Sequence, residues 1–425
     1  MPHKISAALT AAVLSAAFAA QSQQFIPKSI RFQGAPEYST EELMAASGLK
    51  KGVALNYAQM NAVSKVLMDS GIFAGLTFKF DGQDLIFQLT PAEQFLSIHF
   101  DNLPLSPGPD LDAKLHQQLP LYHGKIPSEG GTQEQVRAAL EKMLAEQGLK
   151  ATVIASPGAD PKTHHVDSVH FSIASPPVQV DIKRIDGASP DLVEKLNAIA
   201  KQAAKNPYDT ENSAAGIERV FTVFYQDRGY AAVNVEAVRA GEIVSDPTTI
   251  TVPFAVKITE GHVYRLGAVH LPDGAPVTQA EITKTLTPTA NGPVDGVRVR
   301  SLWGLVVGHY HAKGYLDCKL TPTPKFDEST MTVNYDVAIE PGPVYHLGFV
   351  KFDNVSDELR TYLIRNWQML PGDPFNETYV ANFIATVQQN DPVLRRSLAG
   401  IKTTFDAVAD PQTHDVNVVI RLAKQ

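Results

Sequence analysis

The sequence contains one cysteine in 425 residues and carries more acidic than basic side chains. Cys318 has no partner for a disulfide within the chain, and its alternation with Leu316 and Leu320 favours a packed thiol over a reactive one. The formal net charge of −8 is opposite in sign to the basic surface that phosphate contacts need. We therefore predict no nucleic-acid partner.

Sequence patterns of catalytic and metal sites are also scarce. The chain has no phosphate-binding glycine loop, no G-x-S-x-G elbow and no H-E-x-x-H motif. His309 and His311 are two residues apart on a predicted helix, so they face different directions, and His164 and His165 lie in a predicted turn. We predict no enzyme activity and no catalytic, cofactor-binding or metal-binding residue. A secreted hydrolase with an unrecognised site remains an alternative.

Long apolar runs are missing after residue 24, where no stretch reaches the ~20 residues of a membrane-spanning helix. The N-terminus differs from the rest of the chain. Lys4 precedes residues 5–16, which are mostly small and apolar, and Ala17-Phe18-Ala19 then offers a cleavage site. This layout is typical of a secretory signal peptide over residues 1–20, cleaved after Ala19 or nearby. An N-terminal arm is the alternative. We expect an exported protein with no transmembrane span after signal removal.

What the chain does contain is an internal repeat of roughly eighty residues. Residues 261–269 recur as residues 342–350, and residues 159–166 recur as residues 409–416. A glycine that ends a predicted helix is the third marker, because the residue after a last helical turn often adopts a left-handed conformation. These glycines are Gly71, Gly148, Gly229 and Gly314.

Helical periodicity precedes these glycines, and strand patterns flank them. Val136, Ala139, Leu140, Met143 and Leu144 form one apolar stripe, and similar stripes lie within residues 217–224, 302–310 and 380–387. One strand precedes each helical pair (residues 29–32, 96–100, 178–185, 264–271 and 345–352), and two strands follow it, as at residues 76–80 and 85–89. This order predicts an α+β fold with two helices on a three-stranded mixed sheet.

Five such repeats fit the chain after the signal peptide, joined by short proline-containing links that favour an elongated string. The predicted boundaries are residues 25–91, 92–175, 176–260, 261–341 and 342–425. Tyr264 and Tyr345 recur at the same place in two repeats, which fits packing against the preceding repeat better than ligand binding. Trp303 and Trp367 fall on predicted helices and are interpreted as core residues.

The repeat resembles the POTRA domain, the periplasmic module of BamA-like outer-membrane assembly proteins. The matches are Glu260-Gly261-x-x-Tyr264-x-Leu266-Gly267, Ser70-Gly71-Ile72-Phe73, and the interhelical segments 370–375 and 49–52. The last repeat departs from the pattern, with residues 389–392 where the helix-ending glycine is expected. The sequence ends at Gln425, about where the barrel of those proteins would begin, so their insertion activity is not carried over. The resemblance implies five tandem POTRA domains in the periplasm of a Gram-negative bacterium, associated with the outer membrane.

In POTRA domains the strand after the second helix is typically a sheet edge, and the resemblance implies the same here. Such an edge can pair with another extended chain. The corresponding segments are residues 76–80, 151–156, 231–238, 316–321 and 401–407. The candidate protein-binding residues within them are Thr77, Lys79, Thr152, Ile154, Asn234, Glu236, Asp317, Lys319, Thr403 and Phe405.

The predicted function is therefore a periplasmic scaffold or chaperone-like adaptor in outer-membrane protein assembly or transport. Its expected partners are unfolded or extended outer-membrane proteins, a separately encoded barrel, or another envelope protein. The alternative is a spacer or docking platform of a different cell-envelope complex.

Overall fold

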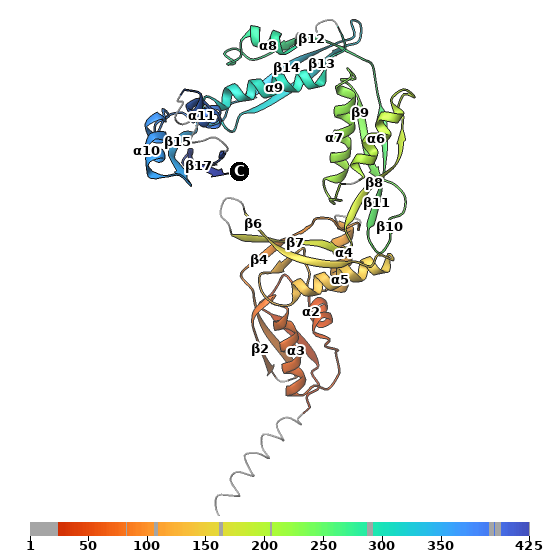
Figure 1. Cartoon of the computed structure of the whole chain (residues 1–425). Coiled ribbons are helices and arrows are strands. Elements are labelled where there is room, and N and C mark those ends of the chain that lie inside the picture. The colour runs from red at the N-terminus through yellow and green to blue at the C-terminus, as the bar shows by residue number, and fades with distance from the viewer. Residues whose placement is uncertain are drawn as a thin grey trace, which may run out of the picture. The chain divides into compact units, whose positions relative to one another are not determined.

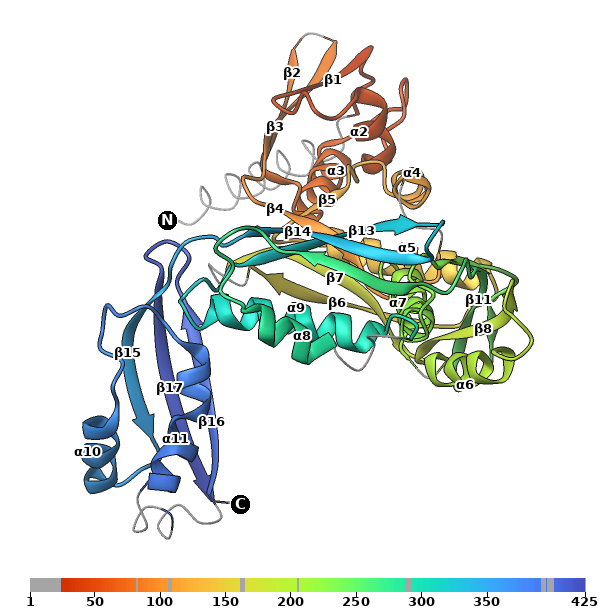
Figure 2. The same cartoon turned by 90° about the horizontal axis from the view of Figure 1, so that it is seen from above.

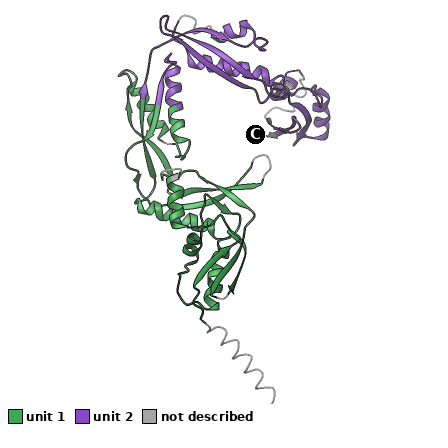
Figure 3. Cartoon of the chain, turned by 180° about the vertical axis from the view of Figure 1, so that it is seen from behind, with its two compact units in different colours: residues 1–218, 236–257 green, residues 219–235, 258–425 purple. Residues whose placement is uncertain are grey.

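The computed structural model describes residues 24–81, 83–105, 109–160, 165–204, 206–286, 292–390, 395 and 401–424. The predicted signal peptide lies outside these residues. Helices alternate with small mixed sheets along the chain (Figure 1), which confirms the predicted α+β class. The chain divides into two compact units, residues 1–218 with 236–257 and residues 219–235 with 258–425 (Figure 3). The boundaries of the five repeats remain predictions.

The first sheet and its two helices follow the predicted order of elements. In chain order these elements are β1 (Ser29–Gln33), α2 (Thr40–Ser47), α3 (Tyr57–Asp69), β2 (Phe73–Asp81) and β3 (Asp84–Pro91). The strand β3 is central, parallel to β1 and antiparallel to β2. Both helices begin with capping boxes, at Ser39 and Asn56, which satisfy the first free amides of each helix. Buried Leu43, Met60 and Phe87 then form the core between helices and sheet.

The second sheet has one strand more than predicted. Its elements are β4 (Phe95–Phe100), α4 (Pro109–Gln118), β5 (Lys125–Pro127), α5 (Thr132–Glu146), β6 (Thr152–Ala159) and β7 (Val166–Ser175), with strand order β5-β4-β7-β6. The added strand β5 pairs with β4 through Ile126 and Leu96, and Ile126 is fully buried. A three-residue strand is too short to show alternation, so the prediction of three strands is wrong here.

The third sheet also gains a short strand. The sheet and its two helices comprise, in chain order, β8 (Val178–Asp186), α6 (Val193–Ala203), α7 (Ser213–Gln226), β9 (Asn234–Arg239), β10 (Val244–Ser245) and β11 (Ile250–Thr259). The central β11 pairs with β8 on one side and with β9 and β10 on the other. The strand predicted at residues 231–238 begins only at Asn234, because the Val233 amide closes a turn onto the Tyr230 carbonyl at 3.2 Å.

Two three-stranded sheets follow in the second unit. The first sheet, together with its helices, comprises β12 (Arg265–His270), α8 (Gln279–Leu286), α9 (Gly296–His311), β13 (Lys319–Asp327) and β14 (Thr332–Glu340). The second comprises β15 (His346–Asp353), α10 (Asp357–Asn366), α11 (Glu377–Asn390), β16 (Ile401–Ala409) and β17 (Asp415–Lys424). Their central strands are β14 and β17, and Figure 2 shows β17 between β15 and β16.

The sequence markers of the repeat occupy equivalent places in the structure. Gly71, Gly148, Gly229 and Gly314 all have positive φ, between 78° and 93°. The recurring segments 159–166 and 409–416 join β6 to β7 and β16 to β17, although residues 161–164 lie outside the described part. The altered segment expected after α11 also lies largely outside it.

The aromatic residues singled out in the sequence are mostly buried. Tyr345 lies in the core of its own sheet, while its amide donates to the Gly314 carbonyl at 2.8 Å and its hydroxyl to Asp317 at 2.8 Å. Trp367, directly after α10, is 9% exposed, and Trp303 is partly buried against two clusters. Cys318 packs beside a buried cluster, and this burial raises the pKa of its thiol. No described helix combines the length and apolar character needed to cross a bilayer.

Candidate functional site

The strand after the second helix lies at a sheet edge in all five sheets. These strands are β2, β6, β9, β13 and β16, and each pairs with an interior strand of its sheet. An edge strand presents backbone N–H and C=O groups on its open side, where a further strand can pair. The order of strands thus provides the edges that the sequence predicted. Whether the backbone amides on the open side of each strand are present and unoccupied then decides which edge can accept a partner strand.

Two prolines identify the residues whose amide positions face the open side of β13. Pro322 and Pro324 lack an N–H, yet they stand opposite Val337 and Tyr335 in an uninterrupted ladder with β14. Proline is tolerated in a sheet where its missing donor would have pointed away from the neighbouring strand. Residues two apart in a strand have their side chains on the same face of the sheet and their amides directed toward the same edge. The open edge of β13 therefore lacks two consecutive donors.

Carboxylates from the second helix occupy the corresponding donors of β6 and β9. The Val153 amide in β6 donates to Glu141 Oε1 of α5 at 2.9 Å. The Ala237 amide in β9 donates to Glu218 Oε1 of α7, also at 2.9 Å. Val153 and Ala237 are both buried, so in each case an inward-facing residue has its amide directed away from the central strand. An added strand would have to displace a charge-assisted hydrogen bond at either edge.

The edges of β2 and β16 carry neither kind of obstruction. Neither strand contains proline, and within the described residues no side-chain oxygen accepts from their amides. The register places Leu76 and Phe78 of β2 opposite Leu89 and Phe87, the positions that match Pro322 and Pro324 of β13. The matching residues of β16 are Phe405 and Ala407. These four amides are the donors available for strand addition.

The predicted side chains have different surroundings in the five strands. Thr77, Lys79, Thr152, Ile154, Asn234 and Glu236 are exposed, as is Lys319 at the start of β13. Thr403 is half-buried, and Phe405 packs against the core below β16. Phe405 therefore contributes its backbone, and not its side chain, to the open edge.

Asp317 does not belong to an edge strand. The strand predicted at residues 316–321 begins at Lys319, and Asp317 lies in the turn before it. The alternation of leucines suggested an earlier start, but Leu316 packs against the core that contains Tyr345, whereas Leu320 packs against a different cluster. The Asp317 carboxylate accepts the Tyr345 hydroxyl, which gives it a structural role between neighbouring repeats.

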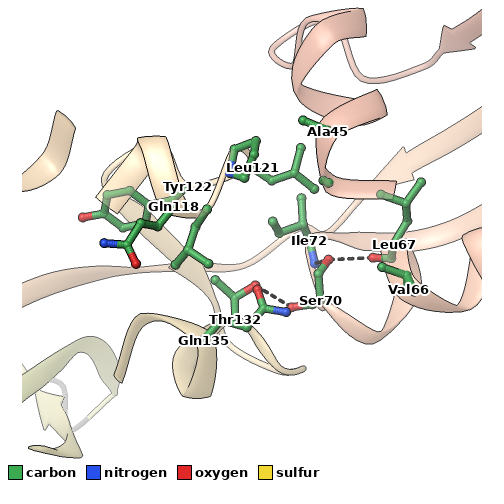
Figure 4. Close-up of a pocket in the computed structure, with 13 residues that line it drawn as sticks. Ala45, Val66, Leu67, Ser70, Ile72, Gln118, Leu121, Tyr122, Thr132 and Gln135 are labelled. Atoms are coloured by element: carbon green, nitrogen blue, oxygen red, sulfur yellow. Dashed lines mark hydrogen bonds between the residues drawn. The ribbon is translucent and has the colours of Figure 1, made fainter. Parts of the chain in front are cut away.

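A cavity of about 240 Å³ lies where the first two repeats meet. Figure 4 shows Leu121 directed toward Ile72 and Ala45, with Tyr122 and Gln118 on the same side as Leu121. On the opposite wall Thr132 Oγ1 donates to the Ser70 carbonyl at 2.7 Å. Leu121 belongs to the core of the first sheet although it lies between α4 and β5. The two repeats therefore share apolar packing and backbone contacts.

Three potential metal ligands lie beside this junction. One atom each of Glu42, His116 and His123 lies within 4.8 Å of the other two. Sequence reasoning missed this group because Glu42 is far along the chain from both histidines and no spacing motif joins them. Burial opposes ionisation of Glu42, but hydrogen bonds from the Ser39 amide and hydroxyl and the nearby His123 hold the Glu42 pKa below its usual value.

No family model matches the sequence. Among solved structures, POTRA domains 3–5 of BamA from Haemophilus influenzae are 14% identical, with a TM-score of 0.37, covering 63% of this chain and 100% of that chain. POTRA domains 1–3 of Omp85 from Anabaena are 16% identical, with a TM-score of 0.22, covering 59% and 95%. The N-terminal domain of Omp85 from Thermosynechococcus elongatus is 15% identical, with a TM-score of 0.20, covering 58% and 97%. The chain resembles these POTRA-containing structures, as its motifs predicted.

Proposed function

We propose that this protein is an exported periplasmic scaffold that binds extended segments of outer-membrane proteins by strand addition. It has no catalytic role. The N-terminal sequence supports export, and the POTRA-like motifs support a place near the outer membrane. The single observation that carries the proposal is the contrast between the edges: β6, β9 and β13 are obstructed, whereas β2 and β16 are open.

The faces of β2 favour a client strand of alternating character. Leu76, Phe78 and Phe80 face the core and are only partly buried, while Thr77 and Lys79 face solvent. An added strand would extend both faces, so its apolar residues would cover the partly buried side and its polar residues would face water. Strands of outer-membrane barrels have this alternation.

The edge of β16 has a similar arrangement. Phe405 contacts the core, whereas Lys402, Thr404 and Asp406 are exposed. The backbone supplies affinity with little demand on sequence, and the alternating faces select amphipathic strands.

Site-specific photo-crosslinking in envelopes of the source organism tests this function. A crosslinking residue at Lys79 in β2 or at Thr404 in β16 should capture outer-membrane proteins. The matched control is the exposed Thr321 in β13, next to Pro322, which should capture few or none. Equal capture at Thr321, or capture of only cell-wall or division proteins at Lys79 and Thr404, would exclude the proposed role and favour a docking platform of another complex.

A further inference from the structure

The side chains of Glu42, His116 and His123 converge from two different repeats. Glu42 lies in the first turn of α2, His116 in the last turn of α4 and His123 shortly after α4. Glu42 Oε1 is 3.0 Å from His123 Nε2 and 3.4 Å from His116 Nε2. Ligands of a tetrahedral ion with bonds of about 2.0–2.2 Å are separated by about 3.3–3.6 Å, so small side-chain shifts bring these atoms to the spacing of a shared ion.

Each donor atom is held in position by a second contact. His116 Nδ1 is 2.9 Å from the Tyr122 carbonyl, which only accepts hydrogen bonds, so Nδ1 carries the proton and Nε2 is free to donate its lone pair. Glu42 Oε2 accepts the Ser39 amide at 2.6 Å, which leaves Oε1 toward the histidines. The His123 ring lies 4.9 Å from the buried Tyr38 ring.

Packing fixes the segment that carries the histidines against the first repeat. Leu121, two residues before His123, is buried in the core of the first sheet. The Tyr122 hydroxyl donates to Asp112 Oδ1 at 2.7 Å and ties the same segment to α4. A metal ion therefore meets ligands that are already close to their bound positions, which limits the cost of ordering them.

We propose that Glu42, His116 and His123 bind a divalent first-row transition-metal ion that links the first two repeats. Two imidazoles and one carboxylate suit Zn²⁺ and its neighbours better than Mg²⁺ or Ca²⁺, which prefer oxygen ligands. The side chains are 21–42% exposed, so solvent fills the remaining coordination position. This site is independent of strand addition, since β2 and β16 contribute none of its ligands.

Zinc binding to the exported chain, prepared without an affinity tag, tests the site by calorimetry and by metal analysis after dialysis. The wild-type protein should bind one Zn²⁺ with these residues. His123→Gln and His116→Gln should each weaken binding by about 10–100-fold or more, because loss of an outer-shell partner alone costs that much. The matched control is His170→Gln, since His170 stacks on His99 at 4.8 Å and contacts Asp101 at 2.8 Å outside the proposed site.

Thermal unfolding without zinc shows whether each variant is folded, and zinc should raise the melting temperature of the wild type and His170→Gln alone. Equal zinc affinity in all four proteins would show adventitious surface binding and overturn the site. Absence of saturable binding to the wild type would also overturn it. Neither result would bear on strand addition at the open edges of β2 and β16, which is tested separately by crosslinking.

Discussion

Gly71 and Gly130 meet backbone to backbone at the junction of the first two repeats. A Cβ built on Gly130 would lie 2.4 Å from the Gly71 Cα, and one built on Gly71 would lie 1.8 Å from the Glu129 carbonyl oxygen. Gly71 also has φ of +80°. This glycine therefore meets two requirements at once, the left-handed end of α3 and close approach of the neighbouring repeat. Gly148 ends α5 with φ of +78° but has open space around its Cβ position.

Gly71→Ala should destabilise the first sheet more than Gly148→Ala destabilises the second. The left-handed conformation alone costs about 1–2 kcal/mol in either variant. The backbone clash at Gly71 should add about 1–3 kcal/mol, because neither backbone can yield as a flexible side chain would. Hydrogen exchange of core amides in β3 and β7 measures the two losses. Equal losses would show that the Gly71 contact contributes nothing to stability.

Glu141→Ala should open the edge of β6. Removing the carboxylate leaves the Val153 amide without its partner, and a net loss of about 1 kcal/mol predicts roughly fivefold faster exchange of that amide. Glu146→Ala, an exposed change on the same helix, is the matched control. The Glu141 variant should also gain crosslinking to clients from Ile154. An unchanged exchange rate of the Val153 amide would contradict the proposal that Glu141 blocks strand addition at the edge of β6.

Local signals in the sequence predicted much of the fold. Apolar stripes located α5, α7, α9 and α11, and the helix-ending glycines located the chain reversals, because both depend on residues close in sequence. Val220 lies within the apolar stripe predicted over residues 217–224 but is 44% exposed, because the spacing of apolar residues does not show how wide the buried face of α7 is. The strand β5 was missed because its burial arises from pairing with β4 and not from its own pattern.

The candidate sites were less accessible to sequence reasoning. The strand edges followed from the order of elements, but Glu141 and Val153 lie on different elements, so their hydrogen bond depends on the folded arrangement. Pro322 and Pro324 are the exception. They stand two apart in the sequence and would have marked β13 as an obstructed edge without a structure.

The hairpin between β16 and β17 should weaken in acid. Amides of Gln412 and Thr413 donate to the Asp410 carboxylate at 2.8 and 3.3 Å, and these bonds hold the Asp410 pKa below its usual value. The stabilisation is fully present above the unfolded pKa of about 3.9 and is lost as pH falls through the lower folded pKa. The Thr413 amide shift should titrate with that lower midpoint. Asp410→Asn, which keeps the turn, should abolish the titration, and a midpoint at or above the usual value would contradict the assignment.

Strand addition at β2 and β16 is tested most directly by hydrogen exchange of the whole chain with a saturating peptide of alternating apolar and polar residues. The amides of Leu76, Phe78, Phe405 and Ala407 should gain protection, while those of Val153 and Ala237 should not change. Protection confined to Val153 and Ala237, or bound peptide with no added protection in β2 or β16, would contradict the proposal.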